Sequence, residues 1–218
     1  MSEVTRPISG RPRGAVPFAP EGWPFIIPML LFTLAAWALG KQIAAPVLML
    51  ILLFTLNFFR DPERATPAGD GLYIAPADGK VIRAEATETG YRVDIFMNVF
   101  NVHVNRAPMA GRIDRVIYTK GKFVNAADLN ASNVNERCRY EMTNSAGEKL
   151  AFTQISGLIA RRIVGYAEAE AEVNAGERIG MIRFGSRVDC EIPAGFELKV
   201  KVGDKVSAGL TVLAARNA

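Results

Sequence analysis

Three short runs of this 218-residue chain carry side chains that could do chemistry. Asp78 lies in the run APADGK, His103 in NVHVNRAP, and Gly185 and Ser186 in RFGSRVD. His103 is the single histidine, and an imidazole with its ordinary pKa of about 6.5 can accept and return protons at neutral pH. Taken singly, the runs also fit plainer roles: an Asp-Gly turn, a structural histidine, and a Gly-Ser pair without the G-x-S-x-G elbow of hydrolases.

The composition excludes several classes of site. With one histidine and two distant cysteines, Cys138 and Cys190, the chain has no disulfide framework, cysteine-rich zinc site or histidine-rich metal centre. The net charge of +4 is not gathered into a basic run with interleaved aromatics, so we expect no nucleic-acid partner. We likewise expect no metal and no pyridoxal phosphate, because the sequence offers no obvious site for either.

The elements that must position these residues fall into two kinds, and the first is apolar. Residues 23–59 contain one charge, Lys41, between an arm at 25–39 and an arm at 43–59. Each arm is apolar on every face and is at or just below the length that spans a bilayer. The pattern predicts a membrane-associating hydrophobic helical hairpin after a polar tail, residues 1–22, that is not typical of a cleaved signal.

Basic residues flank this hairpin on both sides, with Arg6, Arg11 and Arg13 before it and Arg60 and Arg64 after it. Such flanks favour a cytoplasmic location for both ends. We therefore expect a cell-membrane protein whose remaining domain lies on the cytoplasmic face. A shallow insertion in place of a full span, and a buried core hairpin of a soluble fold, stay open as alternatives.

Residues 60–218 are predicted to form one β-rich domain. Gly, Asn and Asp separate short runs of nearly alternating apolar residues. The runs are 91–97, 112–118, 138–143 and 149–155. The pattern predicts an α+β fold dominated by antiparallel strands, in which only residues 157–166 could hold a short helix.

Two segments of this domain resemble one another. Residues 173–179 (VNAGERI) and 201–206 (KVGDKV) each carry a Gly-acidic-basic step before a β-branched residue. They are similar to the hairpins of lipoyl- and biotinyl-type carrier domains, although no lysine-bearing turn lies between the two copies. We expect the architecture to be shared and the carrier function to be absent.

Five segments together resemble, in order and spacing, the short form of the phosphatidylserine decarboxylases. The segments are FFRDPER at 58–64, PADG at 76–79, NVHVNRAP at 101–108, QISGLIARR at 154–162 and FGS at 184–186. The resemblance runs from about Trp23 to the end of the chain. It has one departure: longer family members carry a second histidine three positions after the first, where this chain has Arg106.

The resemblance implies a pyruvoyl-dependent enzyme that cuts its own chain between Gly185 and Ser186. Ser186 would attack the carbonyl of Gly185, His103 would take its proton, and Asp78 would orient His103 and stabilise its charged form. A glycine at the attacked position has no Cβ to block the approach. The products would be a β chain ending at residue 185 and an α chain, 186–218, that begins with the pyruvoyl group.

The implied reaction is decarboxylation of phosphatidylserine to phosphatidylethanolamine through a Schiff base between the pyruvoyl group and the serine amine. His103 is the candidate proton donor after carbon dioxide leaves. Arg106 and Lys122 are candidates for the substrate phosphate, although a solvated surface charge is the plainer interpretation of each. The α and β chains are expected to stay together as a heterodimer. Further oligomerisation and the lipid's backbone and acyl chains stay open.

Two other functions remain as alternatives. A non-enzymatic membrane-anchored adaptor would use carrier-type β hairpins to bind a partner protein, and its chain would stay intact. A serine hydrolase acting on lipids through Asp78, His103 and Ser186 would also stay intact, but it would react with serine-directed probes.

Overall fold

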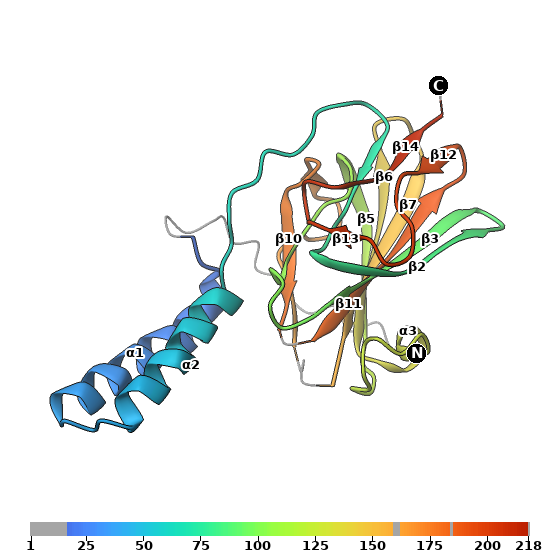
Figure 1. Ribbon diagram of the computed structural model, residues 1–218. Helices are drawn as coiled ribbons and strands as arrows, with labels where there is room; N and C mark the ends of the chain where they lie inside the picture. The colour runs from blue at the N-terminus through green and yellow to red at the C-terminus, as the bar shows by residue number, and fades with distance from the viewer. Residues whose placement is uncertain (1–16, 159–161, 184, 218) are drawn as a thin grey trace. The chain divides into compact units, whose positions relative to one another are not determined.

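The computed structural model describes residues 17–158, 162–183 and 185–217 of the chain. These residues form two compact units that divide between Glu63 and Arg64. The first unit is helical and the second is built mainly of strands (Figure 1).

The apolar segment folds into two helices, α1 (Trp23–Ala38) and α2 (Ala44–Phe58), preceded by a 3₁₀ turn, η1 (Pro20–Gly22). The helices pack against each other, and the rings of Phe25 and Phe59 stack with centroids 5.5 Å apart. In the turn between them Gly40 has a φ of +64°, which a residue with a side chain adopts only under strain. The predicted arms thus form the helices of a hairpin.

The surface of these helices is unusually apolar. By length and composition, the stretch Pro20–Ala38 could cross a membrane, whereas α2 is shorter. Large apolar side chains stay exposed on both helices, among them Leu31, Phe32, Trp37 and Leu50. The N-terminal helix could therefore anchor the chain to a membrane.

Antiparallel pairing builds the second unit (Figure 1). Its main sheet has eight strands in the spatial order β13-β2-β3-β11-β7-β6-β5-β9. Their bounds are β2 (Gly79–Thr87), β3 (Gly90–Met97), β5 (Gly111–Thr119), β6 (Arg137–Asn144), β7 (Lys149–Ser156), β9 (Glu172–Val173), β11 (Ser186–Pro193) and β13 (Lys205–Val206).

Two smaller sheets complete the unit, in the orders β1-β14-β12 and β4-β10-β8. Their bounds are β1 (Leu72–Ile74), β4 (Val104–Arg106), β8 (Ile163–Gly165), β10 (Arg178–Ile182), β12 (Phe196–Leu198) and β14 (Val212–Arg216). A short helix, α3 (Ala131–Val134), lies between β5 and β6 in the sequence. The expected fold, mostly antiparallel β, is confirmed.

Alternation along the strands separates the core from the outer face. In β6 the side chains of Cys138, Tyr140 and Met142 are buried, while the residues between them are partly exposed. The ring of Tyr140 stacks on Phe152 of β7 with centroids 4.9 Å apart. Burial of these apolar side chains on one face is the main favourable contribution to the stability of such a sheet.

The prediction of a helix at residues 157–166 is wrong where the structure can be compared with it. Residues 159–161 lie outside the described residues, and Ile163–Gly165 is strand β8, which pairs with β10. The β-branched residues Ile163 and Val164 favour an extended backbone, and the pairing with β10 provides partners for the hydrogen bonds of that backbone. The short helix of the described part of this unit is instead α3.

Strand β11 holds the central place in the main sheet, between β3 and β7. Its first residue, Ser186, is paired with Met97 on one side and with Ser156 on the other. The sheet therefore fixes the position of Ser186 by two neighbouring strands.

Candidate functional site

Ser186 and His103 meet in a buried site although they are 83 residues apart in the sequence. Both residues are completely buried. The Oγ of Ser186 lies 3.3 Å from Nδ1 of His103, and it also lies 3.4 Å from the sulfur of Met97. The structure thus brings together two of the three residues that the sequence predicts to act in concert.

The second ring nitrogen of His103 shows which nitrogen can accept a proton. Nε2 lies 3.1 Å from the backbone carbonyl oxygen of Asn98. A carbonyl oxygen only accepts, so in the neutral ring the proton is assigned to Nε2 and the lone pair to Nδ1. That lone pair faces the Ser186 hydroxyl. The arrangement therefore suits His103 to take the hydroxyl proton as a general base.

A tight turn holds the Asn98 carbonyl in place. The backbone N–H of Asn98 donates to Oδ1 of Asn101 at 2.8 Å, and the N–H of Asn101 donates back to the Asn98 carbonyl at 3.1 Å. The N–H of Phe100 donates to Oδ1 of Asn98 at 2.9 Å. Asparagine side chains commonly close turns in this way, so the turn orients the acceptor for His103.

The carbonyl of the predicted scissile bond is closely approached by a neighbouring loop. Gly185 has a φ of +59°, a conformation that favours glycine. A Cβ added to Gly157 would lie 2.2 Å from the carbonyl oxygen of Gly185 and 3.1 Å from Cβ of Ala126. Gly157 therefore lets the loop after β7 lie directly against the carbonyl that Ser186 would attack.

The next side chain, Arg187, ties the start of β11 to the loop before α3. It is completely buried, and its guanidinium donates to the carbonyl of Asp128 at 2.8 Å and to that of Ala126 at 3.2 Å. It also donates to the hydroxyl of Ser132 and, at 2.7 Å, to the carboxylate of Asp189. These bonds fix the loop beside the Gly185–Ser186 bond.

A second buried carboxylate lies beside Asp189 on the neighbouring strand. Asp94 of β3 is paired with Asp189 of β11, and burial together with the Asp94 charge raises the pKa of Asp189. Arg92 donates to both carboxylates, at 2.8 Å to Asp94 and at 2.6 Å to Asp189. With Arg187, it offsets the two negative charges and keeps β3 and β11 joined near Ser186.

Asp78 has different partners from those expected. Its carboxylate forms a two-point ion pair with Arg64, in which one bond is 3.0 Å, and accepts the N–H of Ala208 at 2.8 Å. The acceptor at Nε2 of His103 is the Asn98 carbonyl. The predicted orientation of His103 by Asp78 therefore stays a prediction, because the hydrogen bonds that the structure shows for Asp78 lead elsewhere.

The two candidate phosphate ligands lie in different surroundings. Arg106 is buried, and its guanidinium donates to the carbonyl of Gly176 at 2.8 Å. Lys122 is exposed on the loop between β5 and α3, where its backbone pairs with Asn135. Their roles toward a substrate phosphate stay predictions.

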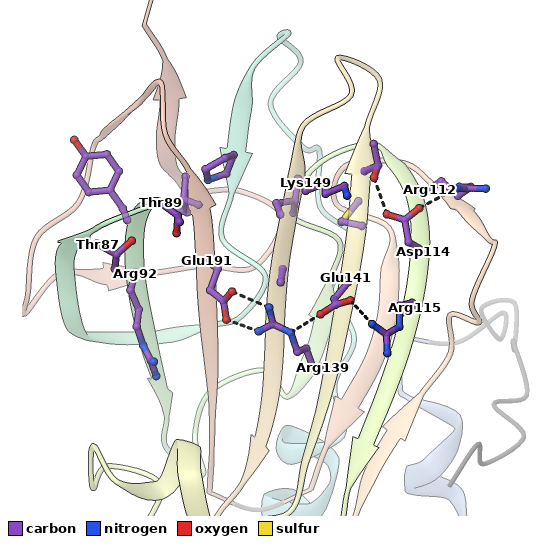
Figure 2. A pocket seen from close by; sticks show the side chains of 17 residues that line it. Thr87, Thr89, Arg92, Arg112, Asp114, Arg115, Arg139, Glu141, Lys149 and Glu191 are labelled. Atoms are coloured by element: carbon purple, nitrogen blue, oxygen red, sulfur yellow. Dashed lines mark hydrogen bonds and ion pairs between the residues drawn. The ribbon is translucent and has the colours of Figure 1, made fainter. Parts of the chain in front are cut away.

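A cavity of about 800 Å³ lies on the main sheet, and of the site residues named so far Arg92 alone lines it (Figure 2). Its walls carry charged side chains from β3, β5, β6 and β11, and none of the predicted site residues lines it. The guanidinium of Arg139 lies between Glu141 and Glu191 and pairs with both. The pairing of Arg139 lowers the pKa of Glu191. Ion pairs between neighbouring strands, such as those of Arg139, point to a structural role.

Several residues that shape the site were missed by sequence reasoning, although they lie inside segments it had singled out. Arg64 ends the run FFRDPER, Gly157 lies in QISGLIARR, and Arg187 follows the predicted cleavage point. Asn98 stands five residues before His103. The types of these residues could have pointed to them. Their partners, however, are set by contacts between strands that are distant in the sequence, and the spacing of residues along the chain does not reveal such contacts.

Comparison with known proteins identifies the same family that the five sequence segments resemble. The family model described as phosphatidylserine decarboxylase matches residues 51–214. A phosphatidylserine decarboxylase proenzyme of Desulfotalea psychrophila is 48% identical over 205 residues, which cover 91% of this chain and 96% of that protein. Proteins of the same name from Nitratidesulfovibrio vulgaris and Burkholderia ambifaria are 47% and 42% identical; they cover 93% and 90% of this chain, and the matches span 96% and 94% of those proteins.

Proposed function

This chain belongs to the phosphatidylserine decarboxylase family, and we propose that it decarboxylates phosphatidylserine to phosphatidylethanolamine after cutting its own backbone. The single observation that carries the self-processing step is the contact of 3.3 Å between the Ser186 hydroxyl and Nδ1 of His103. The word proenzyme in the names of the relatives supports a chain that is processed before it acts.

The cut begins at Gly185. The Oγ of Ser186 adds to the carbonyl carbon of Gly185 while its proton passes to Nδ1 of His103. The C–N bond then breaks, the nitrogen of residue 186 takes that proton, and an ester joins Gly185 to Oγ. The imidazolium that forms in between keeps its Nε2–H bond to the Asn98 carbonyl, which stabilises the charge.

Elimination completes the step. Loss of the α proton of residue 186 expels Gly185 as a free carboxylate and leaves a dehydroalanine, which water converts to a pyruvoyl group with release of ammonia. One water is consumed for each chain cut. The resulting β chain has residues 1–185 and the α chain residues 186–218.

The residues around position 186 fit such a group, because the site is buried, is flanked by paired strands and places an imidazole beside it. The pyruvoyl ketone supplies an electron sink for the loss of carbon dioxide from a substrate amine. The chain's own contribution is to exclude water, hold the reacting atoms in place and return a proton from His103.

The two chains would stay together after the cut. The α chain contains β11, the central strand of the main sheet, and β14, which pairs with β1 and β12. The buried bonds of Arg187 to Asp128 and Ala126 would also join the α chain to the β chain. We therefore propose a heterodimer of α and β chains.

The remaining assignments are parts of the same proposal. Asp78 would support the charged form of His103, and Arg106 and Lys122 are offered as phosphate ligands. The site would work at a membrane, on its cytoplasmic face, where the flanking arginines favour both ends of the hairpin. The likeness of residues 173–179 and 201–206 to carrier-domain hairpins is offered as an architectural relation only.

The experiment is a decarboxylation assay with phosphatidylserine labelled in its carboxyl group. The purified chain should release labelled carbon dioxide, and the Ser186→Ala variant should stay uncut and release none. Release of fatty acid with an intact chain would favour the hydrolase instead. An intact chain that releases neither product, although properly folded, would favour the adaptor.

A further inference from the structure

Three large apolar side chains, on loops that contact the site of the buried Ser186–His103 pair, are themselves exposed. Phe100 is 67% exposed, Leu158 is 67% exposed and Leu129 is 49% exposed. We call these three residues the apolar rim. Large apolar side chains gathered in one region of a surface commonly mark a site of contact with another molecule or with a membrane.

Each rim residue sits on a loop that is bonded to the site. Phe100 lies in the turn whose Asn98 carbonyl binds His103, and Leu158 follows Gly157, which lies against the Gly185 carbonyl. Leu129 follows Asp128, whose carbonyl accepts from Arg187. The rim therefore belongs to one end of the main sheet, the end at which β11 begins.

Two of these loops are held by internal hydrogen bonds. In the loop before α3, the N–H of Asn130 donates to the side chain of Asp128 at 2.9 Å, and the N–H of Ala127 donates to that of Asn125 at 3.0 Å. The turn at Phe100 is closed by its asparagines. Phe100 and Leu129 are thus presented to solvent by ordered backbone.

The surroundings of the rim indicate its partner. Lys120 and Lys122 are exposed on the loop that leads from β5 to Leu129. Their two positive charges exceed the single negative charge of the nearby exposed Asp128. Apolar side chains beside lysines suit the interface of an anionic bilayer, where each adds its own attraction.

We infer that the apolar rim docks the β-rich unit onto an anionic lipid bilayer, so that a lipid head group can pass between the rim loops to residue 186. This inference rests on the proposed function, because it is the lipid substrate that must reach a completely buried serine. The rim residues are docking residues and take no part in bond making.

The test places a fluorescent label on the rim in the full chain. Phe100→Cys, Leu129→Cys and Leu158→Cys are made singly in a Ser186→Ala background, labelled with an environment-sensitive nitrobenzoxadiazole dye and reconstituted in phosphatidylcholine–phosphatidylserine nanodiscs. The native cysteines should not compete, since Cys138 and Cys190 are buried and burial raises the pKa of the Cys138 thiol to about 12.

Ser145→Cys provides the matched control. Ser145 is exposed in the turn between β6 and β7, and the length of β7 puts it roughly 25 Å from the end that carries Ser156. We expect lipid-borne spin labels to quench the dye at all three rim positions and to leave it unquenched at position 145. Rim labels that behave like position 145, or that respond only to protein concentration as in contact with a second copy, would overturn the inference.

A kinetic measurement separates docking from chemistry. The triple variant Phe100→Ser/Leu129→Ser/Leu158→Ser should lose about tenfold or more of its activity on bilayer phosphatidylserine, and far less on a short-chain monomeric form. Val202→Ser, a change at an exposed apolar residue outside the rim, should leave both activities unchanged. Equal losses on both substrates would overturn the inference. If the proposed function itself is wrong, the result will differ: the chain without any substitution will be inactive on both substrates.

Discussion

Gly157 lies so close to Gly185 that a Cβ on the first would come within 2.2 Å of the carbonyl oxygen of the second. That oxygen belongs to the carbonyl that Ser186 would attack, and it is held by backbone packing from a neighbouring loop. The relationship makes the geometry of the scissile bond depend on a residue that has no reactive group.

Gly157→Ala should therefore slow self-cleavage about 100-fold or more, because displacement of the attacked carbonyl by about 1 Å is enough for such a loss. Gel electrophoresis of freshly made protein would follow the release of the small chain. Gly69→Ala is the control, since its new Cβ would meet only the flexible side chain of Leu72. Normal cleavage in Gly157→Ala would show that the close approach is unimportant.

His103→Ala should cut its chain about 10²- to 10⁴-fold more slowly, the usual contribution of a positioned general base. Added imidazole should restore part of the rate in His103→Gly, because a free base can occupy the space left by the ring. A purely structural histidine would not be rescued in this way. Cleavage at the normal rate in His103→Ala would remove it from the mechanism.

Arg64 and Asp78 should be energetically coupled. Their ion pair is largely buried, so either Arg64→Gln or Asp78→Asn leaves one group with a reduced set of partners. A double-mutant cycle of urea unfolding in the Ser186→Ala background should give a coupling energy of about 1–3 kcal/mol. A coupling near zero would contradict the pairing.

The same two variants test the expected action of Asp78 on His103. If Asp78 stabilises the imidazolium, Asp78→Asn should slow self-cleavage more than Arg64→Gln does, in proteins of equal stability. Equal cleavage rates would leave Asp78 only as the partner of Arg64 and Ala208.

Glu191 should stabilise the fold at neutral pH and not in acid. Its bond to Arg139 lowers its pKa, so the folded state prefers the ionised carboxylate. That stabilisation is present above the unfolded pKa and is lost as the pH falls through the lower folded pKa. Glu191→Gln should cost up to about 1 kcal/mol at pH 7, since the pair is half exposed.

The cost of Glu191→Gln should shrink as the pH is lowered toward 3, measured by urea unfolding in the Ser186→Ala background. Glu88→Gln, in the exposed turn between β2 and β3, serves as the control. A cost that stays constant with pH would mean that the carboxylate charge is not what stabilises this part of the sheet.

The strands were predictable because their signal is local. The runs at 91–97, 112–118, 138–143 and 149–155 fall within β3, β5, β6 and β7, and the apolar arms became α1 and α2. The segment 157–166 misled because its short apolar run has no clear period, and pairing of Ile163–Gly165 with β10 decides its conformation.

The sequence predicted that Ser186 and His103 act together, and the structure brings them into contact, but the sequence did not reveal their other partners. His103 is the single histidine, and a serine after a glycine near the end of the chain drew attention by its place among the other segments. The contact of His103 with Asn98, and those of Arg187 with Asp128 and Ser132, depend on how loops meet at one end of the sheet. The spacing of residues along the sequence does not indicate how these loops contact each other.

The most direct test of the central claim is an intact mass spectrum of the purified protein. Two chains are expected, of residues 1–185 and 186–218, the smaller one lighter by one ammonia than a chain that begins with serine. The Ser186→Ala protein should show a single mass. A single 218-residue mass for the unmodified, folded protein would contradict self-cleavage at Gly185–Ser186.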